Sequence, residues 1–339
     1  MSASAGRSGN DGRAARAVRC SILFFLFSLP AVTFGQITVP LSTARVPREA
    51  HWVGEWTWTR GETRLVPIAL DVHPSGEIWG IEGRAHQLFR ADSDGNDVRV
   101  VGGGEGIGQL DLATRVFARS GLKVFTLDPW GAVLDCYDLN GLREQRVELG
   151  TRIEEAGESL GEAIDFCLDP GGDIFLLDGR RECIFRFDGS ARLLQVFGEA
   201  DAAELRTPAA IDVDGFGRIF VLTTRPAGLG MLEPAGKRWH WKPLAGAAGE
   251  TVTPGCLAVD PWGNAFVGDP VAGGVWVFSQ PALDGWFFTL PEDRLQPVDL
   301  AWDAAGRLLV ADAARSRACV FGMNYAGQDL PNDPARTGD

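Results

Sequence analysis

Residues 163–179, AIDFCLDPGGDIFLLDG, contain two short apolar runs on either side of a turn rich in Asp, Pro and Gly. Short apolar runs bounded by such turn formers predict a β-hairpin. Gly172 tolerates a positive φ, and Asp169 can close the turn through its own carboxylate. The stretch is therefore predicted to form the first two strands of an antiparallel sheet.

The same pattern recurs along the chain, and its turn glycines are 43 to 51 residues apart. The six copies begin at Pro67, Leu112, Ala163, Pro208, Pro254 and Pro297, and their turn glycines are Gly76, Gly121, Gly172, Gly217, Gly263 and Gly306. Third and fourth apolar runs follow, as in CIFRFDG and LLQVFG. A four-stranded unit that repeats at this period is typical of a propeller blade. We therefore predict an all-β, six-bladed β-propeller over residues 51–326.

The last copy lacks a fourth strand, because RACVFGMNYAG is followed by the polar sequence QDLPNDPARTGD. Residues 56–67, WTWTRGETRLVP, match residues 286–297, WFFTLPEDRLQP, in their Trp, Thr, Arg-Leu and Pro positions. We therefore expect the segment around Trp52 to Trp58 to supply the outer strand of the last blade. Ring closure of this kind hides strand edges that would otherwise pair with other chains.

The repeated pattern P-x-x-[IL]-x-x-D…G-x-[IL]-[FWL]-[VL]-x-D resembles the NHL-repeat family of six-bladed β-propellers. The resemblance rests on the sixfold recurrence. It is weakest in the second copy, which has no leading Pro and needs one inserted residue, and in the acidic lead-in TRIEEAGESLGEA to the third copy.

The first 35 residues differ from the rest of the chain. Four arginines precede an apolar run from Ile22 to Phe34, and small residues stand before Gln36: the arginines are Arg7, Arg13, Arg16 and Arg19. This pattern predicts a signal peptide over residues 1–35, a linker over 36–50 and export to the periplasm or cell surface. The alternative is attachment to a membrane through an uncleaved N-terminus, although the run contains Pro30 and is short for a spanning helix. Residues 327–339 are predicted to be a disordered tail.

The net charge of −13 for 339 residues makes this acidic chain a poor candidate for nucleic-acid binding. The cysteines after residue 35 show no paired spacing, so we expect small core residues rather than disulfides or a zinc site. The glycine-rich GGGEGIGQLDLA, residues 102–113, is interpreted as a link between blades, and DSDGND, residues 92–97, as a hairpin turn rather than a calcium loop.

Some propellers that resemble this one are lactonases or lyases with a metal over the central channel. The four histidines here, His51, His73, His86 and His240, fall at different positions of the repeat and are not expected to share one zinc ion. Opposed carboxylates on the innermost strands could instead hold calcium or zinc: Asp71, Asp165, Asp212 and Asp299. The competing interpretation is that these aspartates hydrogen-bond neighbouring strands or face a wet channel.

Arginines recur in the turns between the second and third strands and in the links that enter the first strand. Since both sets of loops share one face of a propeller, they could form an anion-binding rim. The candidate binding residues are Arg64, Arg84, His86, Arg180, Arg181, Arg225, Arg294 and Arg315. The alternative is that the arginines pair with blade-end acids such as Asp178 and Asp312.

A propeller fold does not by itself specify an activity. The function expected from these residues is a non-catalytic binding scaffold without a cofactor, which presents one loop face to a protein, peptide or glycan. The alternative is a metal-dependent, lactonase-like hydrolase or lyase that uses the axial carboxylates with calcium or zinc.

Overall fold

The computed structural model describes most of the chain after residue 44. The described ranges are 45–101, 112–198, 205–233, 239–246, 248–279, 285–290, 293–303 and 305–326. The predicted signal peptide, the predicted C-terminal tail and most of the glycine-rich link lie outside these ranges. Within them, no helix has both the length and the apolar character needed to cross a membrane.

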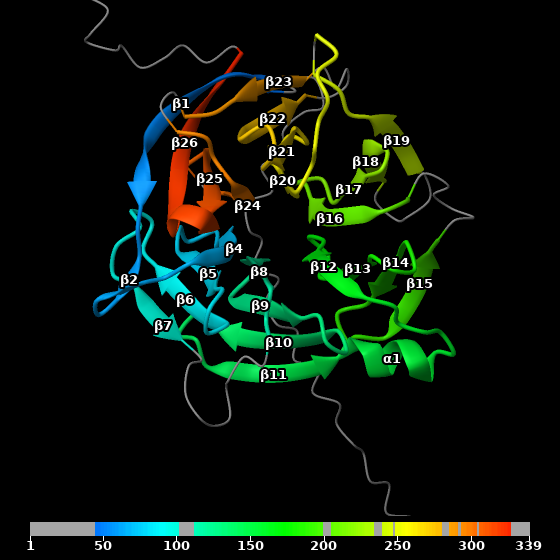
Figure 1. The fold of residues 1–339 in the computed structure, drawn as a ribbon. Coiled ribbons are helices and arrows are strands. Elements are labelled where there is room, and N and C mark those ends of the chain that lie inside the picture. Colours follow the sequence, from blue (N-terminus) through cyan, green and yellow to red (C-terminus); the bar gives the residue numbers. More distant parts are fainter. Residues whose placement is uncertain are drawn as a thin grey trace, which may run out of the picture. The chain divides into compact units, whose positions relative to one another are not determined.

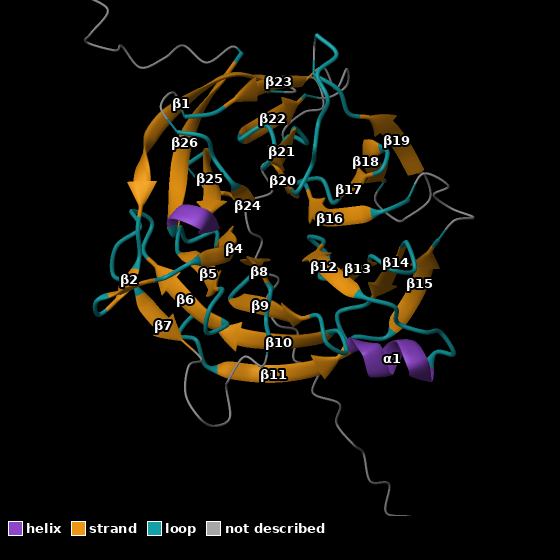
Figure 2. Ribbon diagram, viewed as in Figure 1, coloured by secondary structure: helices purple, strands orange, loops and turns teal. Residues whose placement is uncertain are grey.

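Five antiparallel sheets of the described chain each use four consecutive strands (Figures 1 and 2). Blade 1 consists of β4 (Pro67–Val72), β5 (Ile78–Glu82), β6 (Gln87–Ala91) and β7 (Arg99–Val101). Blade 2 consists of β8 (Arg115–Ser120), β9 (Lys123–Asp128), β10 (Val133–Asp138) and β11 (Arg143–Glu148). Blade 3 consists of β12 (Ala163–Leu168), β13 (Ile174–Asp178), β14 (Cys183–Phe187) and β15 (Leu193–Phe197). Blade 4 consists of β16 (Pro208–Val213), β17 (Ile219–Thr224), β18 (Ala227–Leu232) and β19 (Trp239–Pro243). Blade 5 consists of β20 (Cys256–Val259), β21 (Ala265–Asp269), β22 (Gly274–Phe278) and β23 (Gly285–Phe288).

Blade 6 joins the two ends of the propeller. Its strands are β24 (Pro297–Trp302), β25 (Arg307–Asp312), β26 (Arg317–Tyr325) and β1 (Pro47–Trp56). β1 pairs antiparallel with β26, from Pro47 opposite Tyr325 to Trp56 opposite Ala318. The predicted closure by the N-terminal segment is therefore confirmed. The strand begins at Pro47, and Trp58 lies just beyond its end.

The first strand of each blade contacts the first strand of the next, in the order β4, β8, β12, β16, β20 and β24, and β24 returns to β4. These strands surround a common axis (Figure 1). Because five blades are consecutive meanders and the sixth takes its outer strand, β1, from the N-terminal segment, the periodic sequence is sufficient to build this ring. The predicted six-bladed all-β propeller is confirmed.

Two short elements, a helix and a hairpin, lie outside the repeat, and a 3-10 turn lies within blade 6. Helix α1 (Leu149–Glu155) lies between blades 2 and 3 and buries Ile153, in the acidic lead-in that has no counterpart elsewhere in the repeat. A hairpin of β2 (Thr59–Arg60) and β3 (Thr63–Arg64) leads into blade 1. A single 3-10 turn, η1 (Ala313–Arg315), connects β25 to β26. The sequence pattern predicted neither helix α1 nor the β2–β3 hairpin.

Apolar side chains fill the space between neighbouring blades. Phe266 of blade 5 packs edge-on against Trp302 of blade 6, with ring centroids 4.7 Å apart. The free cysteines of the described chain, Cys136, Cys167, Cys183, Cys256 and Cys319, are all buried, as expected for core residues. The predicted turn at residues 92–97 is also observed, because Asp92 Oδ1 accepts the N–H groups of Asp94 and Asn96 between β6 and β7.

Candidate functional site

The four predicted axial aspartates lie on innermost strands of four blades. Asp71 is on β4, Asp165 on β12, Asp212 on β16 and Asp299 on β24. The first three are at most 8% exposed, and Asp299 is partly buried. A carboxylate in such surroundings needs hydrogen bonds or a positive charge nearby.

Each of these carboxylates hydrogen-bonds the next blade. Asp71 accepts the N–H of Ala118 at 2.7 Å, and Asp212 accepts the N–H of Val259 at 2.7 Å. Asp165 and Asp299 do the same with the next blade in turn: their partners are Ile211 at 2.9 Å and Leu70 at 2.7 Å. The aspartates also bind the N–H of the residue that follows them: Val72, Phe166, Val213 and Leu300. The axial acids therefore connect neighbouring blades through backbone amides.

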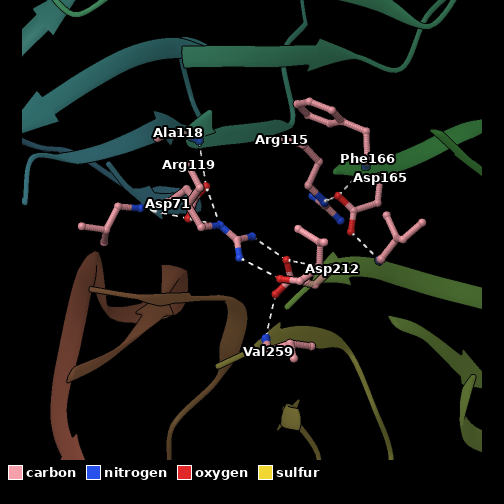
Figure 3. Close-up of polar contacts among 11 residues, drawn as sticks. Asp71, Arg115, Ala118, Arg119, Asp165, Phe166, Asp212 and Val259 are labelled. Carbon is pink, nitrogen blue, oxygen red and sulfur yellow. Dashed lines mark hydrogen bonds and ion pairs between the residues drawn. The ribbon is translucent and has the colours of Figure 1, made fainter. Parts of the chain in front are cut away.

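Arg119 joins two of these aspartates across the axis. Its Nε lies 3.2 Å from Asp71 Oδ1, and its Nη2 donates to Asp212 Oδ1 (Figure 3). The guanidinium also lies 4.9 Å from the centroid of the Phe117 ring. Because the paired carboxylates stabilise the cation, the pKa of Arg119 is raised even though burial opposes its charge. We call Asp71, Arg119 and Asp212 the Arg119 layer.

Arg115 pairs with one of the other two aspartates and acts electrostatically on the second. Its Nε lies 3.4 Å from Asp165 Oδ1 (Figure 3). Its charge also acts on Asp299. Burial raises the pKa of Asp165 to about 6 and that of Asp299 to about 7, although Arg115 and the backbone N–H groups oppose the rise. We call Asp165, Arg115 and Asp299 the Arg115 layer.

Blade 2 supplies both arginines from its first strand, β8, which departs from the repeat at Arg119. The register of β8 and β9 breaks between Phe117 and Ser120, where β8 carries one extra residue. A bulge of this kind redirects a side chain, and here the bulge carries Arg119. The sequence analysis missed both arginines, and the inserted residue in the second copy was the one signal that pointed to them.

The axial carboxylates fit a calcium or zinc ion poorly. Calcium takes about six to eight oxygen ligands, whereas these oxygens already accept backbone N–H groups and contact two guanidinium groups. A metal ion would have to displace a positive charge that the same carboxylates stabilise. The histidines lie apart, with His51 on β1, His73 in the turn after β4, His86 in the turn after β5 and His240 on β19.

The acids at the ends of the second strands are used inside the turns that follow them. Glu82 accepts the N–H groups of Val66, Arg84 and Ala85. Asp178 accepts those of Gly161, Glu162, Arg180 and Arg181, and Asp269 those of Thr253, Val271 and Ala272. These carboxylates hold the loop face together through its backbone amides.

The predicted arginines of this face fall into two groups. Arg181 pairs with Glu158 at 3.2 Å, Arg315 pairs with Asp293 and Asp312, and Arg294 donates to the carbonyl of Val271. The second group is exposed, and no ion pair is found for it among the described residues: Arg64, Arg84, Arg180 and Arg225. His86 is half-buried, and its Nδ1 lies 3.3 Å from the carbonyl oxygen of Ala113.

Comparison with known proteins places the fold. No family model and no curated protein matches the chain. Among solved structures it is similar to a streptogramin B lyase, with 9% identity, a TM-score of 0.56 and coverage of 80% of this chain and 99% of the other. It is also similar to the β-propeller domain of Cps50 (Swd1) from Myceliophteria thermophila, with 7% identity, a TM-score of 0.59 and coverage of 80% and 100%.

A virginiamycin B lyase from Staphylococcus aureus is similar at 10% identity, with a TM-score of 0.53 and coverage of 78% and 82%. At such identities these structures share the fold with this chain, and a shared fold leaves activity open. The six-bladed β-propeller is thus established, whereas membership of the NHL-repeat family is not, because no family model matches the chain.

Proposed function

We propose that this protein is a non-catalytic binding scaffold that presents the loop face, formed by the turns after the second strands and the links into the first strands, to a protein or peptide partner. The observation that carries the proposal is that acids on that face accept hydrogen bonds from backbone N–H groups instead of pairing with the arginines. Glu82 and Asp178 bind backbone amides, so the guanidinium groups of Arg84 and Arg180 are left exposed without a carboxylate partner among the described residues. Guanidinium groups bind carboxylates in a two-pronged geometry.

The axis supports the same proposal. Catalytic carboxylates need oxygens that can reach a substrate, whereas each axial aspartate is bonded to backbone N–H groups. Asp71, Asp165 and Asp212 are also paired with a guanidinium. These residues serve the joining of blades. Elemental analysis and calcium or zinc titrations followed by thermal shift test the hydrolase alternative, because a metal-dependent enzyme should bind an ion at the axis and gain stability with it.

Charge reversal on the loop face tests the scaffold proposal. The triple variant Arg84→Glu, Arg180→Glu and Arg225→Glu should lose cross-linked partners in cells that express the full chain. The control reverses the charge of Arg99, Lys123 and Arg192, which are exposed at the opposite ends of the strands and give the same change in net charge. Equal cross-linking by the loop-face variant, the control and the parent protein would contradict the proposal.

We also propose that the chain is exported and works in the periplasm or at the cell surface. The support is the arginine-rich, then apolar, N-terminal sequence. Mass spectrometry of the purified cellular protein should find a mature chain beginning at Gln36. An intact Met1 peptide in membrane fractions would instead support attachment through the uncleaved N-terminus.

A further inference from the structure

One corner of the loop face combines the β2–β3 hairpin with the turn after β5. Figure 1 shows β2 at the outer side of blade 1. Arg60 Nη1 donates to Gln87 Oε1 at 3.0 Å, which ties the hairpin to the start of β6. We call Arg60, Arg64, Arg84 and His86 the basic corner.

The basic corner has little negative charge of its own. Glu82 is buried and accepts the N–H groups of Val66, Arg84 and Ala85, so its carboxylate is directed into the turn. The β2–β3 hairpin contributes one exposed acid, Glu62, in its turn. Among the described residues, no ion pair to a carboxylate is found for Arg60, Arg64 or Arg84.

At blade 6 and around Arg181, the arginines of the loop face are paired with acids. Arg317 bonds to Glu55, Asp293 and Asp312 at blade 6, and Arg315 shares two of these acids. At blade 3, Arg181 pairs with Glu158, and the preceding segment brings further exposed acids: Glu154, Glu155 and Glu162. The basic corner, by contrast, gathers three exposed arginines without an ion pair among the described residues: Arg60, Arg64 and Arg84.

An apolar side chain lies next to the corner. Leu112 is 48% exposed, and His86 Nδ1 contacts the carbonyl oxygen of the adjoining residue, Ala113. Charge and exposed apolar surface together are characteristic of peptide recognition, in which an apolar anchor supplements charged contacts. A long nucleic-acid backbone would be repelled by the rest of this chain, whose net charge is −13.

We propose that the basic corner binds an acidic peptide segment of the partner, with carboxylates on Arg60, Arg64 and Arg84 and an apolar side chain against Leu112. This inference rests on the proposed scaffold function and specifies both the partner chemistry and the part of the face that it uses. Complementary charge speeds association and weakens with salt.

The experiment measures fluorescence anisotropy of labelled peptides with the full chain. The acidic peptide EELEE should bind, its neutral counterpart QQLQQ should bind at least about tenfold more weakly, and added salt should reduce EELEE binding. The variant Arg60→Glu, Arg64→Glu and Arg84→Glu should lose at least about tenfold in EELEE affinity. Lysine at these three positions should restore part of it, because lysine keeps the charge without the planar fork.

The matched control reverses the charge of Arg99, Lys123 and Arg192 at the opposite ends of the strands, which gives the same change in net charge, and it should change EELEE affinity less than about twofold. Thermal melting confirms that each variant is folded. If the control lost EELEE affinity and the corner variant did not, the basic corner would not be the peptide site, whereas the scaffold function would still stand. Absence of EELEE binding, or tighter binding of a labelled oligothymidine than of EELEE, would also overturn the inference. The cross-linking test above decides the scaffold function independently.

Discussion

Arg119 of blade 2 bonds to Asp212 of blade 4, although these two blades are not neighbours in the ring. The same guanidinium lies 3.2 Å from Asp71 of blade 1. One side chain therefore connects three blades at the axis, and it neutralises carboxylates that are 4% exposed.

Replacement of Arg119 by Met should strongly destabilise the propeller. The variant leaves Asp71 and Asp212 without their cation, and removal of one partner of a buried ion pair costs about 3–5 kcal/mol. Urea denaturation followed by tryptophan fluorescence measures the loss. The control is Arg99→Met, since Arg99 and Asp97 form an exposed pair worth less than about 1 kcal/mol. Equal denaturation midpoints for the two variants would show that Arg119 has no special role.

Stability should depend on pH through the Arg115 layer. Burial raises the pKa of Asp299 to about 7 in the folded protein, above the ordinary value of 3.8, so the folded state binds this proton more tightly than the unfolded state. The resulting stabilisation is complete below the unfolded pKa and is lost as pH rises through the folded pKa. Asp165, whose pKa is raised to about 6, acts in the same direction.

The variant Asp299→Asn removes this titration while keeping an acceptor for the N–H of Leu70. Its melting temperature, relative to the parent, should therefore be higher at about pH 8 than at about pH 5.5. Differential scanning calorimetry across this range makes the comparison. Parallel curves for parent and variant would mean that Asp299 does not titrate there.

Deletion of residues 47–56 should lower the melting temperature by more than about 10 °C, because it removes β1 and exposes the edge of β26. Addition of a peptide that spans residues 45–60 should recover much of the loss by pairing with β26. A deletion protein that melts within a degree or two of the parent would show that β1 does not close the ring.

Trp58 should anchor the segment that follows β1. It is fully buried, its ring centroid lies 5.0 Å from that of Phe89, and its Nε1 donates to the carbonyl of Gly95 at 3.0 Å. Trp58→Ala should cost about 3–5 kcal/mol. Trp52→Ala is the matched control, because Trp52 is 56% exposed and its loss should cost less than about 0.5 kcal/mol. Chemical denaturation distinguishes the two, and a similar cost for both would argue against the anchor.

The sequence alone determined the number of blades, their strand order and the closure by the N-terminal segment. The physical reason is that these features arise from local rules repeated six times: apolar runs of strand length, turn glycines such as Gly172, and acids such as Asp178 that end a strand. A strand-and-turn pattern that would be weak evidence in one copy becomes specific for a propeller when it recurs six times. The missing fourth strand of the last copy then required a partner from the other end of the chain.

The tertiary structure alone decided the role of the axial acids and of the arginines. Asp71 and Asp299 occupy repeat positions that a metal site or a seam between blades would use equally well, and the choice depends on which amides and cations face them. Arg115 and Arg119 reach the axis through an irregular strand, and Arg60 reaches blade 1 through a hairpin outside the repeat. Such pairings join residues far apart in the chain, so periodicity cannot reveal them. Long-range geometry, rather than residue type, separates the arginines that stabilise this propeller from those available to bind a partner.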